Sequence, residues 1–247
     1  MTVRDLTGTG TSEERWQSSG VLDELPRVDP AAVRPPGRVV VLAPHPDDET
    51  LGAGATLAAW ARAGTEVAVL AVTDGEASHP GSPTLSPDEL AERRVVERSE
   101  ALGELGLGGA RVVRAGLPDG GVGRHRSGLA AAVADLVVAG DTLLAPVVGD
   151  GHPDHDAVAE AATDASAAGV PVLRYAVWWW HWARPEEFDP AGAVAVVPDD
   201  AARRAKRAAV ARFTTQVAPL SDDPADAAIL PAPVLDRLLR ADEVLWR

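Results

Sequence analysis

The sequence predicts an α/β fold: a Rossmann-like, three-layer arrangement with a mostly parallel sheet. Short apolar runs typical of buried strands alternate along the chain with longer Ala- and Leu-rich segments typical of helices. The length of 247 residues suffices for one large α/β domain and is too short for two. Apolar residues make up 46% of the chain and charged residues 24%, as in an ordinary globular protein with a substantial core.

The first 37 residues differ from the remainder, so we predict an N-terminal extension at 1–37 and a single domain at 38–247. The extension is polar and ends in a proline-rich stretch. A buried Trp16 would anchor this segment to the domain, whereas without that packing it would be a floppy terminus.

The predicted elements follow one another with short connections. The expected strands are apolar runs at 39–43, 66–73, 111–116, 142–146, 172–177, 193–197 and 243–246, the last of them an edge strand. The expected helices are at 50–63, 87–103, 129–138, 154–168, 200–213 and 234–240. Ser86 followed by Pro87 and two acids is a typical helix start, with a serine cap and proline at the first position.

Charge and composition exclude several classes of partner. The formal net charge of −14 argues against nucleic acid and against anionic membrane surfaces. The chain has no cysteine, so neither a disulfide framework nor a thiolate metal site exists. No apolar run reaches transmembrane length and the first twenty residues lack the apolar core of a signal peptide, which predicts a cytoplasmic protein. The sequence neither predicts nor excludes an oligomer.

The segment around which the chain is organised follows the first strand of the domain. Directly after 39–43 come Pro44, His45 and Pro46, then the three acids Asp47, Asp48 and Glu49. Ligands of open α/β sheets bind beyond the carboxyl ends of the strands. His45 and Asp48 are spaced to share a face if a helix begins here, which leaves Asp47 free for another role. The segment therefore predicts a metal site that needs a further ligand from elsewhere.

A second segment offers that ligand about a hundred residues later. The apolar run 142–146 is followed by a loop containing His152, Pro153, Asp154 and His155, and then by an Ala-rich helix. Because both runs are expected in one parallel sheet, the two turns should converge at its carboxyl edge.

The paired segments, HPDDE and then HPDH, resemble those of the PIG-L/LmbE-like zinc-dependent deacetylases, which remove acetyl groups from N-acetylglucosamine-containing and related substrates. The resemblance runs from about Arg38 to the C-terminus. It implies one Zn²⁺ per chain held by His45, Asp48 and His155, with Fe²⁺ or another divalent ion as the alternative. Three protein ligands with an open fourth position are typical of catalytic zinc.

The same resemblance implies roles for three neighbouring residues. Asp47 would be the general base that deprotonates the attacking water. A protonated His152 would help to stabilise the oxyanion. Asp154 would orient a histidine, with helix capping as the alternative role.

Six residues are candidates for substrate contacts. By resemblance, the arginine pair after the proline- and serine-rich loop reaches the pocket, although a solvated ion pair is the alternative for at least one of them. An aspartate after the strand at 111–116 resembles one that contacts sugar hydroxyls, with an Asx turn as the alternative. The aromatic run at 178–182 offers indole faces for a sugar ring, although core packing explains some of these rings. The candidates are Arg93, Arg94, Asp119, Asp150, Trp180 and His181.

Asp150 stands where some sugar-conjugate deacetylases carry a mobile tyrosine. The only tyrosine of this chain, Tyr175, lies on a predicted strand. A tyrosine-assisted oxyanion hole is therefore not expected here.

The predicted function is removal of an acetyl group from an N-acetylglucosamine-type amino sugar or its conjugate, a small-molecule substrate. An amidase acting on another small amide in natural-product or thiol-conjugate metabolism is the alternative. Gly52-Ala53-Gly54 with Asp74 suggests a dinucleotide-binding oxidoreductase, but the third glycine is missing and the neighbouring acids would repel a pyrophosphate. A non-catalytic sugar-binding module could use the tryptophans but would not need Asp47.

Overall fold

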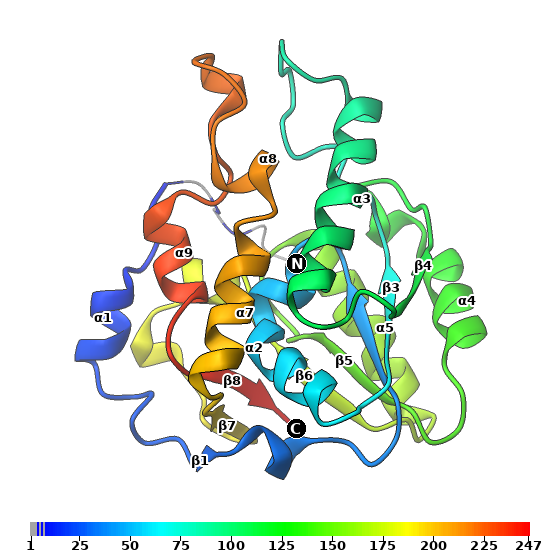
Figure 1. Ribbon diagram of the computed structural model, residues 1–247, viewed down its shortest axis with the longest axis vertical. Helices are drawn as coiled ribbons and strands as arrows, with labels where there is room; N and C mark the ends of the chain where they lie inside the picture. Colours follow the sequence, from blue (N-terminus) through cyan, green and yellow to red (C-terminus); the bar gives the residue numbers. More distant parts are fainter. Residues whose placement is uncertain (1–3, 5, 7) are drawn as a thin grey trace.

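The computed structural model describes residues 4, 6 and 8–247, and its centre is one eight-stranded sheet (Figure 1). The strand order is β1-β7-β8-β6-β5-β2-β3-β4, and only β8 runs antiparallel to its neighbours. The strands are β1 (Arg27–Val28), β2 (Val39–Ala43), β3 (Val67–Ala71), β4 (Arg111–Arg114), β5 (Thr142–Pro146), β6 (Val172–Tyr175), β7 (Ala193–Val196) and β8 (Glu243–Trp246). The predicted mostly parallel α/β fold is confirmed.

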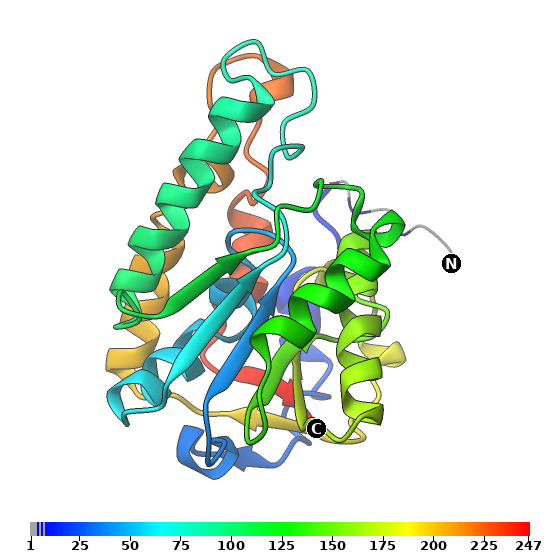
Figure 2. The same ribbon diagram turned by 90° about the vertical axis from the view of Figure 1, so that its right-hand side faces the viewer.

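Helices cover both faces of the sheet, which gives the three predicted layers. Figure 2 shows α3 and α7 on one side and α4 and α5 on the other. The helices are α1 (Glu13–Ser18), α2 (Asp48–Arg62), α3 (Pro87–Glu104), α4 (Arg126–Leu136), α5 (Pro153–Ala167), α6 (Trp179–Trp182), α7 (Asp200–Val210), α8 (Thr214–Val217) and α9 (Ala232–Leu238). None of the helices in the described part of the chain is long and apolar enough to cross a membrane.

The central strand β2 is apolar throughout because both of its faces are buried. Val39, Val41 and Ala43 pack into the core cluster that also contains Leu57 of α2. Val40 and Leu42 point the other way, into the cluster beneath α4 and α5. This two-sided burial is typical of parallel strands and explains the continuous apolar run.

Strand β8 corrects one prediction, because it is not an edge strand. It lies between β6 and β7 and pairs antiparallel with both, and the edges of the sheet are β1 and β4. A short apolar run reveals that a strand is buried, but it carries no information about which strands flank it.

The segment before Arg38 packs onto the domain. Trp16 is fully buried, and its indole Nε1 donates a hydrogen bond to the Trp180 carbonyl at 3.0 Å. Strand β1 pairs with β7, so this segment adds an edge to the sheet. Residues 1–3, 5 and 7 of the predicted extension lie outside the described residues.

Helix α2 is bent, and a buried ion pair holds the bend. The backbone at Ala53 is non-helical, with φ −146° and ψ 21°. Lys206 on α7 donates from Nζ to the Leu51 carbonyl at 2.8 Å and to Glu243 Oε1 at 2.7 Å. The Glu243 carboxylate in turn accepts the backbone N–H groups of Ala55 and Thr56. The pair thus satisfies backbone groups on both sides of the bend, which orients the first turn of α2.

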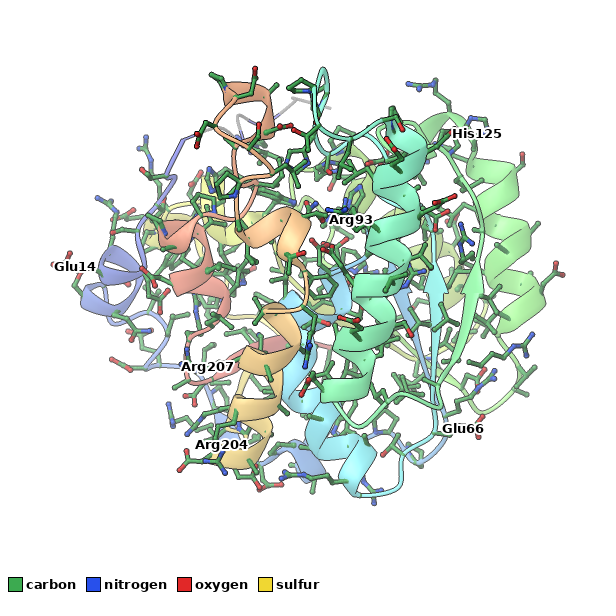
Figure 3. The ribbon with its side chains drawn as sticks, turned by 45° about the horizontal axis from the view of Figure 1, so that its top comes forward. Glu14, Glu66, Arg93, His125, Arg204 and Arg207 are labelled. Carbon is green, nitrogen blue, oxygen red and sulfur yellow. The ribbon has the colours of Figure 1, made fainter. Side chains whose placement is uncertain are left out.

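We expect Lys206→Met to lower the free energy of unfolding by about 3–5 kcal/mol, because it leaves the buried Glu243 carboxylate without its cation. Denaturant titration followed by circular dichroism measures this change. Arg204→Met is the matched control: Arg204 lies on the same helix and is exposed (Figure 3), so its replacement should change stability by only about 0.5 kcal/mol. A loss as small as the control's would contradict a clamping role for the pair.

A second ion pair joins the amino ends of β2 and β5 and predicts a pH dependence of stability. Arg38 binds the Asp141 carboxylate through two hydrogen bonds, of 2.6 and 3.1 Å. The hydrogen bond from Arg38 lowers the pKa of Asp141. A lowered pKa means that the contribution is complete above the carboxyl's ordinary pKa of about 4 and is lost as the pH falls further.

Asp141→Asn should therefore cost about 2 kcal/mol of unfolding free energy at pH 7, and the difference from wild type should shrink below about pH 4. Chemical denaturation at several pH values gives this difference directly. Asp135→Asn, at an exposed position of α4, should show no such convergence. A difference that stays constant down to pH 3 would mean that Asp141 does not titrate as the ion pair requires.

Candidate active site

The carboxyl ends of β2 and β5 are neighbours in the sheet, and the two predicted segments meet there. A pocket of about 350 Å³ opens at this edge. Its polar lining includes His45, Asp47, Asp48, Arg94, Asp119, His152 and Gln216. Its apolar lining includes Leu51, Pro80, Val177, Trp178, Ile229 and Leu230.

Three donor atoms form a nearly equilateral triangle beside this pocket, and two of the three residues, His45 and Asp48, also line it. His45 Nδ1, Asp48 Oδ2 and His155 Nε2 lie 3.2 Å from one another in each pairing. Ligands bound to tetrahedral zinc at its usual bond lengths are separated by about 3.3 Å. The donor set of two imidazoles and one carboxylate also suits zinc or Fe²⁺. The residues therefore fit a divalent ion.

Two carboxylates hold the histidines in the orientation that metal binding needs. Asp150 lies 2.8 Å from His155 Nδ1, and Asp119 lies 3.0 Å from His45 Nε2. Each carboxylate thus lies at the ring nitrogen that is outside the donor triangle, and the nitrogen within the triangle stays available to an ion. Although burial opposes it, the neighbouring carboxylates raise the pKa of His155 to about 9. The acids around these rings thus favour a positive charge, which a divalent ion would supply.

Other groupings of donors exist among the described residues. His45, His152 and His155 could also hold an ion, as could His45, Asp119 and Asp154. The ring centroids of the three histidines are 4.7 to 5.3 Å apart. Metal binding by variants distinguishes these sets from the predicted one.

Asp47 occupies the position before the first helical residue of α2 and lines the pocket. Its carboxylate Oδ2 contacts Arg94 Nη2 at 3.2 Å and is nearly buried. Burial raises the pKa of Asp47 to about 6, although the Arg94 guanidinium acts in the opposite direction. A divalent cation nearby would add to the effect of Arg94 and favour the ionised carboxylate.

The surroundings of His152 oppose the protonated ring that the resemblance implies. Burial and the neighbouring His45 and His155 lower its pKa to about 3. Its Nδ1 accepts the backbone N–H of Asp154 at 3.2 Å, so it caps helix α5. A neutral ring that accepts through Nδ1 carries its proton on Nε2 and can donate that hydrogen to an oxygen atom.

Asp154 does not cap the helix, because His152 has that role. Its carboxylate accepts the backbone N–H groups of Gly120 at 2.7 Å and Val122 at 3.0 Å. It also lies 3.4 Å from His45 Nε2. Asp154 therefore links the loop after β4 to His45.

Of the two adjacent arginines, one lies at the pocket and the other is exposed to solvent. Arg94 lines the pocket and donates to the Gly75 carbonyl as well as to Asp47. Arg93 is exposed on α3 and does not line the pocket (Figure 3). Successive helical residues point in different directions, so only one of the two can face the site.

Three of the predicted substrate contacts are buried and do not line the pocket. Asp150 is fully buried, and its carboxylate accepts the backbone N–H groups of Val177, Trp178 and Trp179. Trp180 packs in an aromatic cluster with Trp16 and Phe188. His181 is also buried, with its Nδ1 2.8 Å from an Arg237 nitrogen.

Trp178 and Ile229 line the pocket without having been singled out as contacts. Trp178 belongs to the predicted aromatic run, but the α6 turn places only this one of the run's four tryptophans at the pocket. Ile229 and Leu230 stand in a proline-rich loop, where an apolar pair is the only sequence signal. As expected, Tyr175 is remote: its hydroxyl donates to the Leu42 carbonyl inside the core.

The packing of Gly52 and Gly54 contradicts the dinucleotide-binding interpretation. Gly52 lies within α2, and a Cβ there would fall 2.1 Å from the Tyr175 ring. Gly54 packs against the Lys206 side chain. These glycines allow close packing of side chains and do not form a turn for a pyrophosphate.

The fold and the donor cluster define an α/β protein with a candidate mononuclear metal centre at the carboxyl edge of its sheet. Residues 40–166, just over half of the chain, match the family described as PIG-L, GlcNAc-PI de-N-acetylase. The chain belongs to the PIG-L family, and the predicted resemblance is confirmed.

Individual relatives agree with this assignment. A 1D-myo-inositol 2-acetamido-2-deoxy-alpha-D-glucopyranoside deacetylase of Kineococcus radiotolerans is 33% identical over 189 residues, which cover 60% of this chain and 52% of that protein. The chain thus spans about half the length of this relative. The conserved protein TT1542 of Thermus thermophilus is 31% identical, with a TM-score of 0.51, over 71% of this chain and 80% of its own. The A40926 pseudoaglycone deacetylase Dbv21 is 25% identical, with a TM-score of 0.60, over 85% of this chain and 96% of its own.

Proposed function

We propose that this protein is a metal-dependent hydrolase that removes the acetyl group from an N-acetylglucosamine-type amino sugar or its conjugate. The observation that carries the proposal is the triangle of His45, Asp48 and His155 donor atoms, next to which a further carboxylate, Asp47, lines the pocket. Zinc is the proposed ion, with Fe²⁺ as the alternative. The name of the Kineococcus radiotolerans relative, a deacetylase of a 2-acetamido-2-deoxy-glucopyranoside, supports the substrate class.

The roles of the residues follow from their surroundings. When bound, the ion supplies a Lewis acid for attack by water on the acetamide carbon. Asp47 is held in place by Arg94 and takes a proton from the attacking water. The same carboxyl group returns this proton to the amine nitrogen as the C–N bond breaks, so that acetate and the free amine leave. The Nε2–H of neutral His152 donates a hydrogen bond to the carbonyl oxygen as negative charge develops there. Asp119, which lines the pocket, accepts a hydrogen bond from a sugar hydroxyl.

The direct test is amine release by the zinc-loaded chain from a panel of N-acetylated sugars, with a fluorogenic amine label. We expect turnover of at least one N-acetylglucosamine conjugate and none after the ion is removed with a chelator. N-acetyl-lysine and acetanilide serve as acetamides without a sugar. Turnover of these amides alone would support the amidase alternative, and no turnover with a full complement of metal would reject the proposal.

A further inference from the structure

Two loops far apart in the sequence rise side by side next to the pocket. They are residues 75–86, between β3 and α3, and residues 218–231, between α8 and α9 (Figures 1 and 2). Each contributes to the pocket lining: Ser78 and Pro80 come from the first loop, and Ile229 and Leu230 from the second. The outer part of the pocket is therefore assembled from both loops.

One buried carboxylate joins these loops. Asp226 is fully buried although its loop projects from the domain. It accepts hydrogen bonds from the Ser82 and Thr84 hydroxyls of the first loop and from Ser221 of its own loop. A carboxylate satisfied by three hydroxyls of two segments fixes the distance between them. Asp226 thus has a positioning role for the outer pocket.

The pocket lining combines two kinds of surface. Its acids and histidines follow the carboxyl ends of β2, β4 and β5, whereas Pro80 and Ile229 of the two projecting loops, together with Trp178, add apolar surface. Arg94 is the one Lys or Arg among the described lining residues, and Asp47 and the Gly75 carbonyl already engage it. Gln216 Nε2 is likewise engaged by Ser78 and Thr215 hydroxyls.

We infer that the outer part of the pocket is an apolar acceptor subsite, so the preferred substrates are N-acetylglucosamine glycosides whose aglycone is an aromatic or aliphatic group. This inference rests on the proposed function, which puts the acetamide at the donor triangle and leaves the aglycone at the apolar part. The apolar side chains there would displace water from the hydroxyls of a polyhydroxylated acceptor such as inositol without hydrogen-bonding to them. An anionic acceptor would find no free cation among the described lining residues.

The kinetic test uses the zinc-loaded chain and three kinds of substrate. They are free N-acetylglucosamine, its α- and β-phenyl glycosides, and its myo-inositol conjugate. We expect kcat/KM for at least one phenyl glycoside to exceed that for the free sugar about tenfold, because the ring leaves water. The inositol conjugate should stay near the free sugar. An inositol conjugate that matches or exceeds both phenyl glycosides overturns the inference.

Variants test whether the preference for the phenyl glycoside depends on residues of the outer pocket. Trp178→Ala and Asp226→Ala should reduce the ratio of kcat/KM for the phenyl glycoside to that for the free sugar. Asp222→Ala, exposed in the same loop, and Val138→Ser, exposed before β5, should leave the ratio unchanged. If Asp226→Ala does not fold, Thr84→Val and Ser82→Ala each remove one hydroxyl that donates to Asp226. The inference is overturned if the ratio is unchanged in every one of these variants that folds.

Binding of the amine products separates this inference from the proposed function. Calorimetry should show that phenyl glucosaminide binds about tenfold more tightly than glucosamine, and that Trp178→Ala removes the difference. If no sugar is deacetylated but this binding preference is present, the proposed function fails and the apolar subsite stands. If the two amines bind equally, the inference fails even where every sugar is deacetylated.

Discussion

Asp47→Asn should lower kcat by about 10²–10⁴-fold while the metal content stays at the wild-type level, because positioned proton transfer contributes about that much to catalysis. Asparagine has nearly the same shape as aspartate, so it preserves the start of α2 and the packing beside Arg94, but it cannot accept a proton from water. Asp47 lies outside the donor triangle, whose atoms come from His45, Asp48 and His155. The measurement is initial-rate kinetics on zinc-loaded protein together with elemental analysis of the same sample.

The matched control for this variant is Asp156→Asn, which removes a largely buried acid of the second segment that does not line the pocket. Its kcat should stay close to that of the wild-type protein. Near-normal turnover by Asp47→Asn would assign the base to another group. Loss of metal from Asp47→Asn would instead place this carboxylate among the ligands.

The sequence predicted those features of the site that depend on which residues directly follow each strand. His45, Asp47 and Asp48 follow one buried strand, and His152 and His155 follow another, so parallel pairing alone brings them to one edge. The helix boundaries differ from the predictions by few residues for the same reason: caps such as Ser86 with Glu89 are encoded within one turn. Local chemistry was therefore sufficient for the proposed metal centre.

The outer pocket could not be predicted, because it depends on contacts between distant segments. Ile229 lines the pocket only because the loop at 218–231 lies beside the loop at 75–86. Asp150 precedes the second segment and looks like a pocket residue in the sequence, yet the turn into α6 presents three backbone N–H groups to it. Trp180 and Trp178 are two residues apart and differ only in which way the α6 turn directs them. These placements follow from tertiary packing, which no local pattern records.

The second large effect concerns the ligands themselves. His155→Ala should abolish stoichiometric metal binding and turnover together, because it removes one corner of the donor triangle. Asp150→Asn should weaken zinc binding about 10–100-fold, because Asp150 only orients His155 through Nδ1. His152→Ala should retain the ion, lose turnover, and cost about 1 kcal/mol of stability as a lost helix cap. Calorimetric zinc titration of the metal-free proteins ranks the three variants.

The ranking decides between the donor groupings that the described residues offer. Loss of stoichiometric metal from His152→Ala with retention by Asp48→Ala would favour the grouping of three histidines. Loss from Asp48→Ala with retention by His152→Ala would support the predicted triangle, in which the carboxylate is 3.2 Å from both imidazole nitrogens. His125→Ala is the control for removing a histidine: this residue is exposed at the start of α4 (Figure 3), so neither metal binding nor turnover should change. A carboxylate ligand also leaves His152 free to donate its Nε2–H to the substrate, so the same titration tests whether one histidine remains available for chemistry.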